Sequence, residues 1–184
     1  MPKKKLTWLI TGCSSGLGLS LTRVVQAAGH RVIATSRDPS RTPDLVAEVE
    51  GQGGRWLQLD VDDADSGRLV DDLERGGGEQ IDVLVNNAGY VLHAPVETTT
   101  EDEARAVMET LYFGPLRLIR AAVPHMRRRR FGVVANFSSG AALDARESMG
   151  VYAGAKAALD GEWVLPTEQC FISSLSRDAC VRGC

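Results

Sequence analysis

The stretch TGCSSGLG at residues 11–18 joins an apolar run, residues 5–11, to a helical pattern over residues 17–29. Its three glycines permit a tight turn and let the backbone approach a pyrophosphate at the positive end of a helix; they are Gly12, Gly16 and Gly18. A phosphate-binding P-loop is the rival motif, but it requires a Gly-Lys-Ser/Thr ending that is absent here. Three glycines at this place could also serve only to form a turn, without binding a ligand. The strand-turn-helix context favours nucleotide binding.

Short apolar runs alternate with helical patterns along the rest of the chain. Further strands are predicted at residues 31–36, 55–61, 81–87 and 131–139. One helix is predicted to begin at Thr42-Pro43, and a second, after the third strand, to end at about Glu74. A third is predicted from Thr100 to about Arg130, and a fourth begins at Tyr152. This alternation predicts an α/β fold, a doubly wound parallel sheet of Rossmann-like type, with about five strands and helices on both faces.

Composition places limits on the class of protein. The chain has 184 residues, a net charge of −3 and 43% hydrophobic residues, which suits one globular domain, placed at residues 1–161. No apolar run reaches membrane-spanning length, and the acidic balance gives no reason to expect nucleic acid. The basic start lacks a signal-peptide cleavage site, and four cysteines form no disulfide or metal-ligand pattern. A cytoplasmic protein without a bound metal is therefore expected.

The end of the second strand bears on the choice of nucleotide. An acid near this point holds the ribose 2′-hydroxyl of NAD, whereas an arginine suits the 2′-phosphate of NADP. Ser36 stands where the acid is expected, and Arg37 follows it. NADP is the preferred cofactor on this reading, NAD remains possible, and a solvated arginine is the ordinary alternative.

The segment YAGAK at residues 152–156 places a phenol and an ammonium one helical turn apart. An ammonium on the same helical face favours the phenolate form of the tyrosine. Taken alone, the pair also fits a surface tyrosine beside a solvated lysine.

Five motifs in the same order resemble the short-chain dehydrogenase/reductase family over about residues 5–161. They are TGCSSGLG at 11–18, Asp60-Val61, NNAG at 86–89, NFSSG at 136–140 and YAGAK at 152–156. The resemblance implies an NAD(P)-binding Rossmann fold that interconverts a ketone or aldehyde and an alcohol by hydride transfer.

The resemblance also implies roles for individual residues. Ser139, thirteen residues before Tyr152, would hydrogen-bond the substrate oxygen, Tyr152 would be the acid/base, and Lys156 would hold the nicotinamide ribose. The residues expected to bind the cofactor are Gly12, Ser14, Ser15, Gly16, Leu17, Gly18, Arg37, Asp60, Val61, Asn86, Asn87, Ala88, Gly89, Tyr152 and Lys156.

The chain departs from the family pattern at two places. Leu111 stands where the family carries an asparagine of the proton relay, three residues before Gly114. After residue 161 the pattern fails, so residues 162–184 are expected to be a disordered or poorly packed tail, with the last strands of the family fold missing. The fifth strand would then be an exposed apolar edge. The tail reads as translated intron or other mis-spliced sequence.

Two function hypotheses follow. The first is an NADP-preferring oxidoreductase acting on a small carbonyl compound or alcohol bound near Tyr90–Val96, His93 and Ala141–Gly150. The mixed apolar character of these loops suits a lipophilic substrate. The second is a nucleotide-binding remnant or mis-spliced fragment without activity, and the sequence leaves a homo-oligomer open. The basic run at residues 127–130 is expected to cap the end of a long helix rather than to bind a polyanion.

Overall fold

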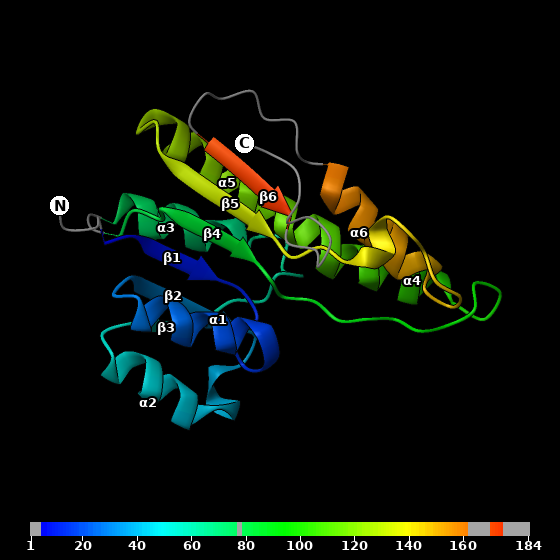
Figure 1. Cartoon of the computed structure of the whole chain (residues 1–184), viewed down its shortest axis with the longest axis horizontal. Coiled ribbons are helices and arrows are strands. Elements are labelled where there is room, and N and C mark those ends of the chain that lie inside the picture. The colour runs from blue at the N-terminus through cyan, green and yellow to red at the C-terminus, as the bar shows by residue number, and fades with distance from the viewer. Residues whose placement is uncertain (1–4, 77–78, 162–169, 175–184) are drawn as a thin grey trace.

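A single parallel β-sheet with helices on both faces organises the chain (Figure 1). The computed structural model describes residues 5–76, 79–161 and 170–174. The strand order is β3-β2-β1-β4-β5-β6. The strands are β1 (Thr7–Ile10), β2 (Arg31–Ser36), β3 (Arg55–Gln58), β4 (Val83–Asn86), β5 (Gly132–Asn136) and β6 (Cys170–Ser174). The order reverses direction at β1 and β4, which confirms the doubly wound fold class.

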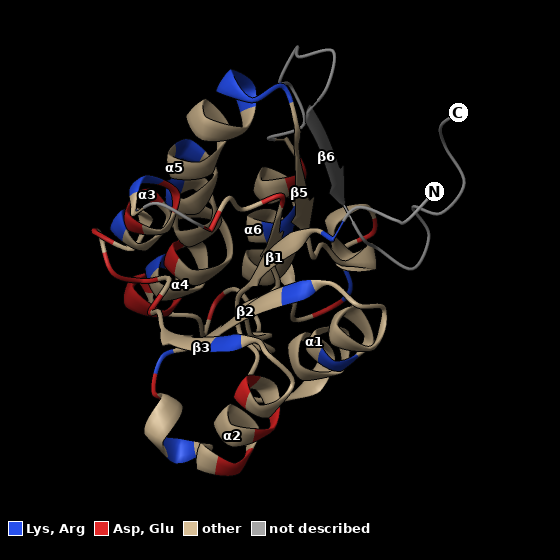
Figure 2. Cartoon of the chain, turned by 90° about the vertical axis from the view of Figure 1, so that its left-hand side faces the viewer, with Lys and Arg blue, Asp and Glu red and all other residues tan. Residues whose placement is uncertain are grey.

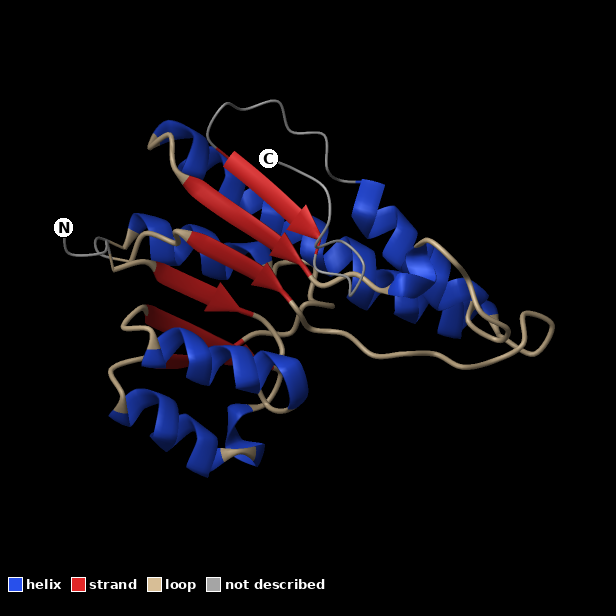
Figure 3. Cartoon of the chain, in the orientation of Figure 1, coloured by secondary structure: helices blue, strands red, loops and turns tan. Residues whose placement is uncertain are grey.

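The helices form two layers around this sheet (Figures 2 and 3). Helices α1 and α2 lie on one face, and α3 and α5 lie on the other. The bounds are α1 (Gly16–Ala27), α2 (Pro43–Gly51), α3 (Gly67–Arg75), α4 (Glu101–Met108), α5 (Gly114–Arg128) and α6 (Gly150–Gly161), with short 3₁₀ turns η1 (Pro39–Arg41) and η3 (Gly140–Ala142). Every helix within the described ranges is too short or too polar to cross a bilayer.

The strands are apolar because both of their faces are covered. Leu9 and Leu84 point to the core under α3 and α5, whereas their neighbours Ile10 and Val85 point to the core under α1 and α2. Successive side chains of each strand therefore pack into two separate cores on opposite faces of the sheet. For this reason the strands are continuous apolar runs in the sequence.

The sheet contains one more strand than the sequence predicts. Residues Cys170–Ser174, in the segment expected to be an unstructured tail, form β6 and pair in parallel with β5 from Gly132↔Cys170 to Asn136↔Ser174. The expected exposed edge at β5 is therefore covered, and the sheet has six strands where about five were predicted. Residues 170–174 can form a strand because the unpaired edge of β5 offers backbone hydrogen-bonding groups to an adjacent extended segment. The sequence did not predict this strand, because five residues are too few to show a strand periodicity. The rest of the predicted tail, residues 162–169 and 175–184, lies outside the described residues.

The long helix predicted between Thr100 and Arg130 is interrupted. A π-helical turn, η2 (Glu109–Phe113), separates α4 from α5. The start is as predicted, because Thr100 and Glu103 form a reciprocal capping box. A π turn inserts one residue into the helix and is frequent at functional sites. It carries Leu111, the position that departs from the family pattern.

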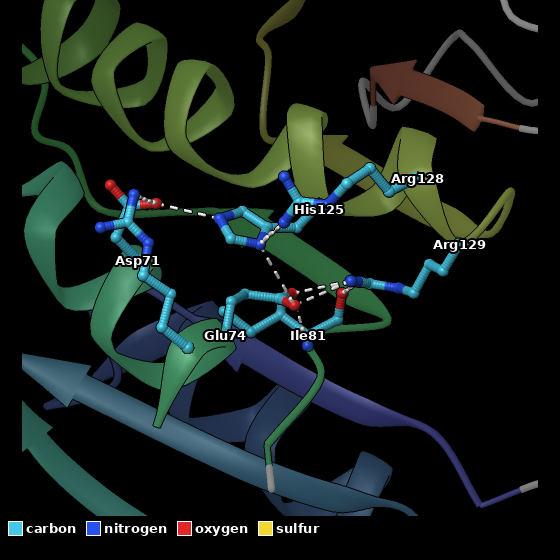
Figure 4. A network of polar contacts seen from close by, with 7 residues as sticks. Asp71, Glu74, Ile81, His125, Arg128 and Arg129 are labelled. Carbon is cyan, nitrogen blue, oxygen red and sulfur yellow. Dashed lines mark hydrogen bonds and ion pairs between the residues drawn. The ribbon is translucent and has the colours of Figure 1, made fainter. Parts of the chain in front are cut away.

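Two of the four arginines in the basic run at the end of α5 make side-chain contacts within the fold (Figure 4). Buried His125 contacts the Asp71 carboxylate at 2.9 Å and the Arg128 guanidinium at 2.6 Å. Arg129 pairs with Glu74 at 2.9 Å and also donates to the Ile81 carbonyl. These contacts fasten the last turn of α5 to α3 and to the segment that enters β4. Arg127 and Arg128 lie in the last turn of the helix, as the capping interpretation expects.

Candidate active site

The glycine-rich turn lies between β1 and α1 at the carboxyl edge of the sheet. Gly12 and Gly16 have φ angles of 71° and 57°, values that side chains with a Cβ rarely adopt. A Cβ at Gly12 would lie 2.8 Å from the Ala88 Cα, so the close approach of a second segment also requires glycine there. Ser15 is the N-cap of α1 and makes no side-chain capping hydrogen bond. The N–H groups of the first helical turn are therefore available to an anion.

The NNAG segment is fastened directly to this turn. The Thr11 hydroxyl accepts hydrogen bonds from the backbone N–H groups of Asn87, at 3.0 Å, and Ala88, at 2.9 Å. In return, the Asn87 side-chain amide donates to the carbonyls of Thr11, at 2.8 Å, and Gly12, at 3.2 Å. Two motifs about 75 residues apart in the chain thereby form one rigid wall.

A cavity of about 420 Å³ opens against this wall. Eleven of the residues predicted to bind a cofactor line it: Gly12, Ser14, Ser15, Gly16, Leu17, Arg37, Asp60, Val61, Asn87, Ala88 and Gly89. These residues come from the carboxyl ends of four adjacent strands, which is where doubly wound sheets bind ligands. The tertiary structure thus brings most of the predicted cofactor residues together.

Two predicted cofactor residues lie behind the wall instead. A Cβ on Gly18 would clash with the Gly12 carbonyl oxygen and lie 2.5 Å from the Asn87 amide nitrogen, so Gly18 permits close packing of α1. Asn86 is buried, and its side-chain amide donates to Asn136 on β5 at 2.8 Å. Both residues support the site without lining the cavity.

The end of β2 presents one charged group to the cavity. Ser36 is buried, and its hydroxyl accepts a hydrogen bond from the Trp56 indole at 3.0 Å. The next side chain, Arg37, is exposed and lines the cavity. Within the residues that the structure describes, its guanidinium makes no hydrogen bond or ion pair, so it is available to an anionic ligand.

Tyr152 and Lys156 both lie on the buried face of α6, with exposed fractions of 8% and 6%. They do not line the 420 Å³ cavity. The Lys156 ammonium donates to the Phe137 carbonyl at 2.5 Å, and a Cβ on Gly89 would lie 4.0 Å from its Nζ. Gly89 therefore connects the cavity wall to the tyrosine-lysine helix. Burial lowers the pKa of Lys156 to about 8, and the Asp160 carboxylate opposes this effect.

The two serines after β5 have different partners. Ser139 is the N-cap of η3, and its hydroxyl oxygen accepts from the Ala141 N–H at 3.2 Å. The Ser138 hydroxyl donates to the Asp160 carboxylate at 2.7 Å. Ser139 thus retains a hydroxyl proton that no described contact uses, which is consistent with choosing it over Ser138 as the substrate contact.

Leu111 is buried in the core between α4 and α6, with an exposed fraction of 1%. A Cβ on Gly89 would lie 2.6 Å from its Cδ2 atom, so the leucine lies against the same segment that borders Lys156. Its side chain offers no hydrogen bond at that place.

Sequence reasoning missed several residues that line the cavity. Leu59 and Asp62 flank the predicted Asp60-Val61 pair, and their position beside that pair was the available signal. Tyr90 begins the loop predicted for substrate and also lines the cavity. Thr110 reaches it from the π turn, which nothing in the sequence revealed.

The chain is similar to known proteins over most of its length. The family pattern described as short chain dehydrogenase matches residues 7–162. Oxidoreductase claN of Passalora fulva is 40% identical over 156 residues, which cover 84% of this chain and 71% of that protein. Retinol dehydrogenase 8 of Homo sapiens is 40% identical over 163 residues, covering 84% of this chain and 51% of that protein.

A solved structure extends the likeness to three dimensions. A metagenomic short-chain oxidoreductase in complex with NADP has a TM-score of 0.84 and 26% identity, covering 93% of this chain and 81% of that one. The chain spans about half the length of several curated relatives that it matches. The match over residues 7–162, together with the 40% identity to one relative and the fold shared with the solved structure, shows that the chain belongs to the short-chain dehydrogenase family.

Proposed function

We propose that the chain binds NADP(H) and serves an oxidoreductase that interconverts a carbonyl compound and an alcohol, with Tyr152 as acid/base. One observation carries the proposal: the predicted cofactor motifs converge on a single cavity, and its wall at Gly89 borders the buried lysine of the tyrosine-lysine helix.

The residues present fit a dinucleotide along the length of the cavity. The Gly12–Gly18 turn and the uncapped start of α1 suit a pyrophosphate, because no side chain fills the space there. Asp60 and Val61 line the part suited to adenine. Arg37 suits a 2′-phosphate, which favours NADP over NAD. Gly89 and Lys156 border the part suited to the nicotinamide ribose.

The chain's own residues supply the remaining chemistry. When bound, NADPH supplies a hydride to the carbonyl carbon. Ser139 donates a hydrogen bond to the substrate oxygen as negative charge develops on it, and Tyr152 transfers its proton to that oxygen. The Lys156 ammonium holds the ribose and stabilises the phenolate that remains. In the direction of alcohol oxidation, the Tyr152 phenolate accepts the proton.

The surroundings favour a lipophilic substrate. Tyr90, Val91 and Leu143, in the loops after β4 and β5, are 46%, 47% and 78% exposed. Apolar side chains left exposed next to a site suit an apolar ligand. A relative named retinol dehydrogenase 8 is consistent with this class.

A second candidate is a nucleotide-binding protein without turnover. Buried Leu111 favours it, because this position lies against Gly89 and cannot hold a water for proton delivery. In this case the chain keeps the cofactor cavity but lacks the proton relay that turnover requires.

A titration with NADPH and NADH, followed by NADPH oxidation with a panel of lipophilic ketones and aldehydes, tests both candidates. We expect binding by NADPH at least about tenfold tighter than by NADH, since a charge-assisted contact to Arg37 contributes about 1.5–3 kcal/mol. Tyr152→Phe should retain binding and lose turnover by about 100-fold or more. Binding without turnover in the wild type supports the second candidate, and no binding of either nucleotide contradicts both.

A further inference from the structure

Asp160 lies one helical turn after Lys156 on α6, at the same spacing that separates Lys156 from Tyr152. Its carboxylate accepts a hydrogen bond from the Ser138 hydroxyl at 2.7 Å. Ser138 stands between Phe137 and Ser139 in the segment that leaves β5.

Two adjacent residues of this segment are held by different residues of α6. The Lys156 ammonium donates to the Phe137 carbonyl at 2.5 Å, and Asp160 holds the Ser138 side chain. The helix itself connects Lys156 to Asp160, so these contacts close a ring between α6 and the end of β5. Ser139 is the next residue in the chain, so the contacts of this ring help to fix its position.

The ring also contains a charged group that acts on Lys156, the Asp160 carboxylate. Burial lowers the pKa of Lys156 to about 8, and the Asp160 carboxylate is the group that acts against this decrease. An adjacent negative charge stabilises the protonated form of a buried amine.

Other elements packed on α6 present apolar residues to it. Val107 of α4 and Leu111 of η2 contact the cluster that contains Tyr152. The titratable groups on these elements are Glu101, paired with Arg105, Glu103, paired with Thr100, Glu109, paired with Arg117, exposed Asp102, and half-buried Tyr112, whose ring packs on Phe113. The turn η3 carries no titratable side chain, and the loop that joins it to α6 carries Asp144, Arg146 and Glu147, all exposed. Tyr152 is the remaining titratable group on the same face of α6.

We propose that Asp160 is a positioning residue for the active site, which keeps Lys156 protonated and holds the Ser138–Ser139 segment against α6. The part of this inference that concerns turnover rests on the proposed function. The part that concerns the protonation of Lys156 does not depend on it.

Two substitutions separate the two roles of Asp160. Asp160→Asn keeps an oxygen that accepts from Ser138 but removes the charge. Ser138→Ala removes the hydrogen bond but keeps the charge. Asp160→Glu restores the charge and serves as the conservative variant, and Asp102→Asn removes an exposed carboxylate of α4 as a matched control.

The direct readout is an NMR titration of protein labelled with ¹³C at the lysine Cε atoms. The sequence contains three other lysines, Lys3, Lys4 and Lys5, so the Lys156 signal can be assigned with a Lys156→Met sample. We expect the midpoint of Lys156 to fall by about one pH unit or more in Asp160→Asn, to change less in Ser138→Ala and Asp160→Glu, and to stay unchanged in Asp102→Asn. Coincident titrations of the wild type and Asp160→Asn would overturn the proposal.

The activity readout distinguishes this inference from the proposed function. In an active wild type, Asp160→Asn should move the alkaline limb of the kcat/KM profile to lower pH, and Ser138→Ala should lower kcat without moving that limb. A wild type that binds no nucleotide and shows no turnover contradicts the proposed function, and the NMR titration still decides the role of Asp160. If Asp160→Asn fails to fold, a Ser138→Ala protein with unchanged kcat contradicts the positioning role.

Discussion

Lys156 shows at the scale of one residue how a buried charge acts against stability. Its ammonium is almost fully buried, and its pKa falls from 10.5 to about 8. A decrease of about 2.5 units corresponds to roughly 3 kcal/mol of unfavourable charge burial when both the folded and the unfolded states are protonated. Such a cost is typical of sites where the chemistry, and not packing, determines the residue.

We predict that Lys156→Met stabilises the protein at pH 7 by about 1–2 kcal/mol, because the gain from removing the buried charge exceeds the cost of the unpaired Phe137 carbonyl. Between pH 8 and 10.5 the unfolded wild type binds more protons than the folded form, so wild-type stability rises with pH relative to the variant. Urea unfolding at pH 7, 8.5 and 10 measures the difference. Exposed Lys5→Met is the control, and a difference that does not narrow with pH contradicts the prediction.

At the scale of elements, β6 determines whether the sheet has an exposed edge. It covers the whole length of β5 through five register pairs. Without it, the backbone groups along one side of β5 would remain unpaired, and such edges recruit other chains. The strand therefore matters for the association state of the protein as well as for its stability.

We predict unequal effects from Phe171→Pro and Ile172→Pro. Successive residues of a strand direct their N–H groups to opposite sides, so only one of the two groups donates to β5. The proline that removes this donor should cost about 1–3 kcal/mol and increase light scattering, while the other should be tolerated. Hydrogen exchange of the Phe171 and Ile172 amides in the wild type identifies which of the two donates to β5. Two variants that both match the wild type would be evidence against the pairing of β6 with β5.

At the scale of the whole molecule, the cavity joins segments that are distant in sequence into one unit. The glycine turn, the ends of β2 and β3, NNAG and the π turn all contribute to its lining. A ligand bound there stabilises all of them together, because it binds the folded state and not the unfolded chain.

We predict that NADPH at 100 times its dissociation constant stabilises the fold by about 2.7 kcal/mol, which corresponds to an increase in Tm of about 5–10 °C. Gly18→Ala should abolish this increase, since its Cβ would displace the Gly12 carbonyl and the Asn87 amide. Gly154→Ala is the matched control, because a Cβ at this exposed helical position meets nothing within 4 Å. It should keep the full increase. An equal increase in the Gly18→Ala protein would show that this turn does not cradle the nucleotide.

The sequence by itself determined the fold class, the first five strands and most residues of the cavity. Those features depend on local patterns: apolar runs long enough to be buried strands, and glycines at a strand-helix turn. It also predicted the capping box of α4, which involves residues only three apart.

Only the tertiary structure decided the remaining features, because each depends on contacts between distant residues. The strand β6 exists through its pairing with β5, and the π turn became visible only in the folded helix. Gly18 and Asn86 carry family motifs, yet their neighbours Gly12 and Asn136 hold them behind the cavity wall. Asp160 belongs to none of the predicted motifs, and only the folded chain places Ser138 beside it. A one-dimensional pattern identifies the residue types that a site requires, but packing determines which of them face the ligand.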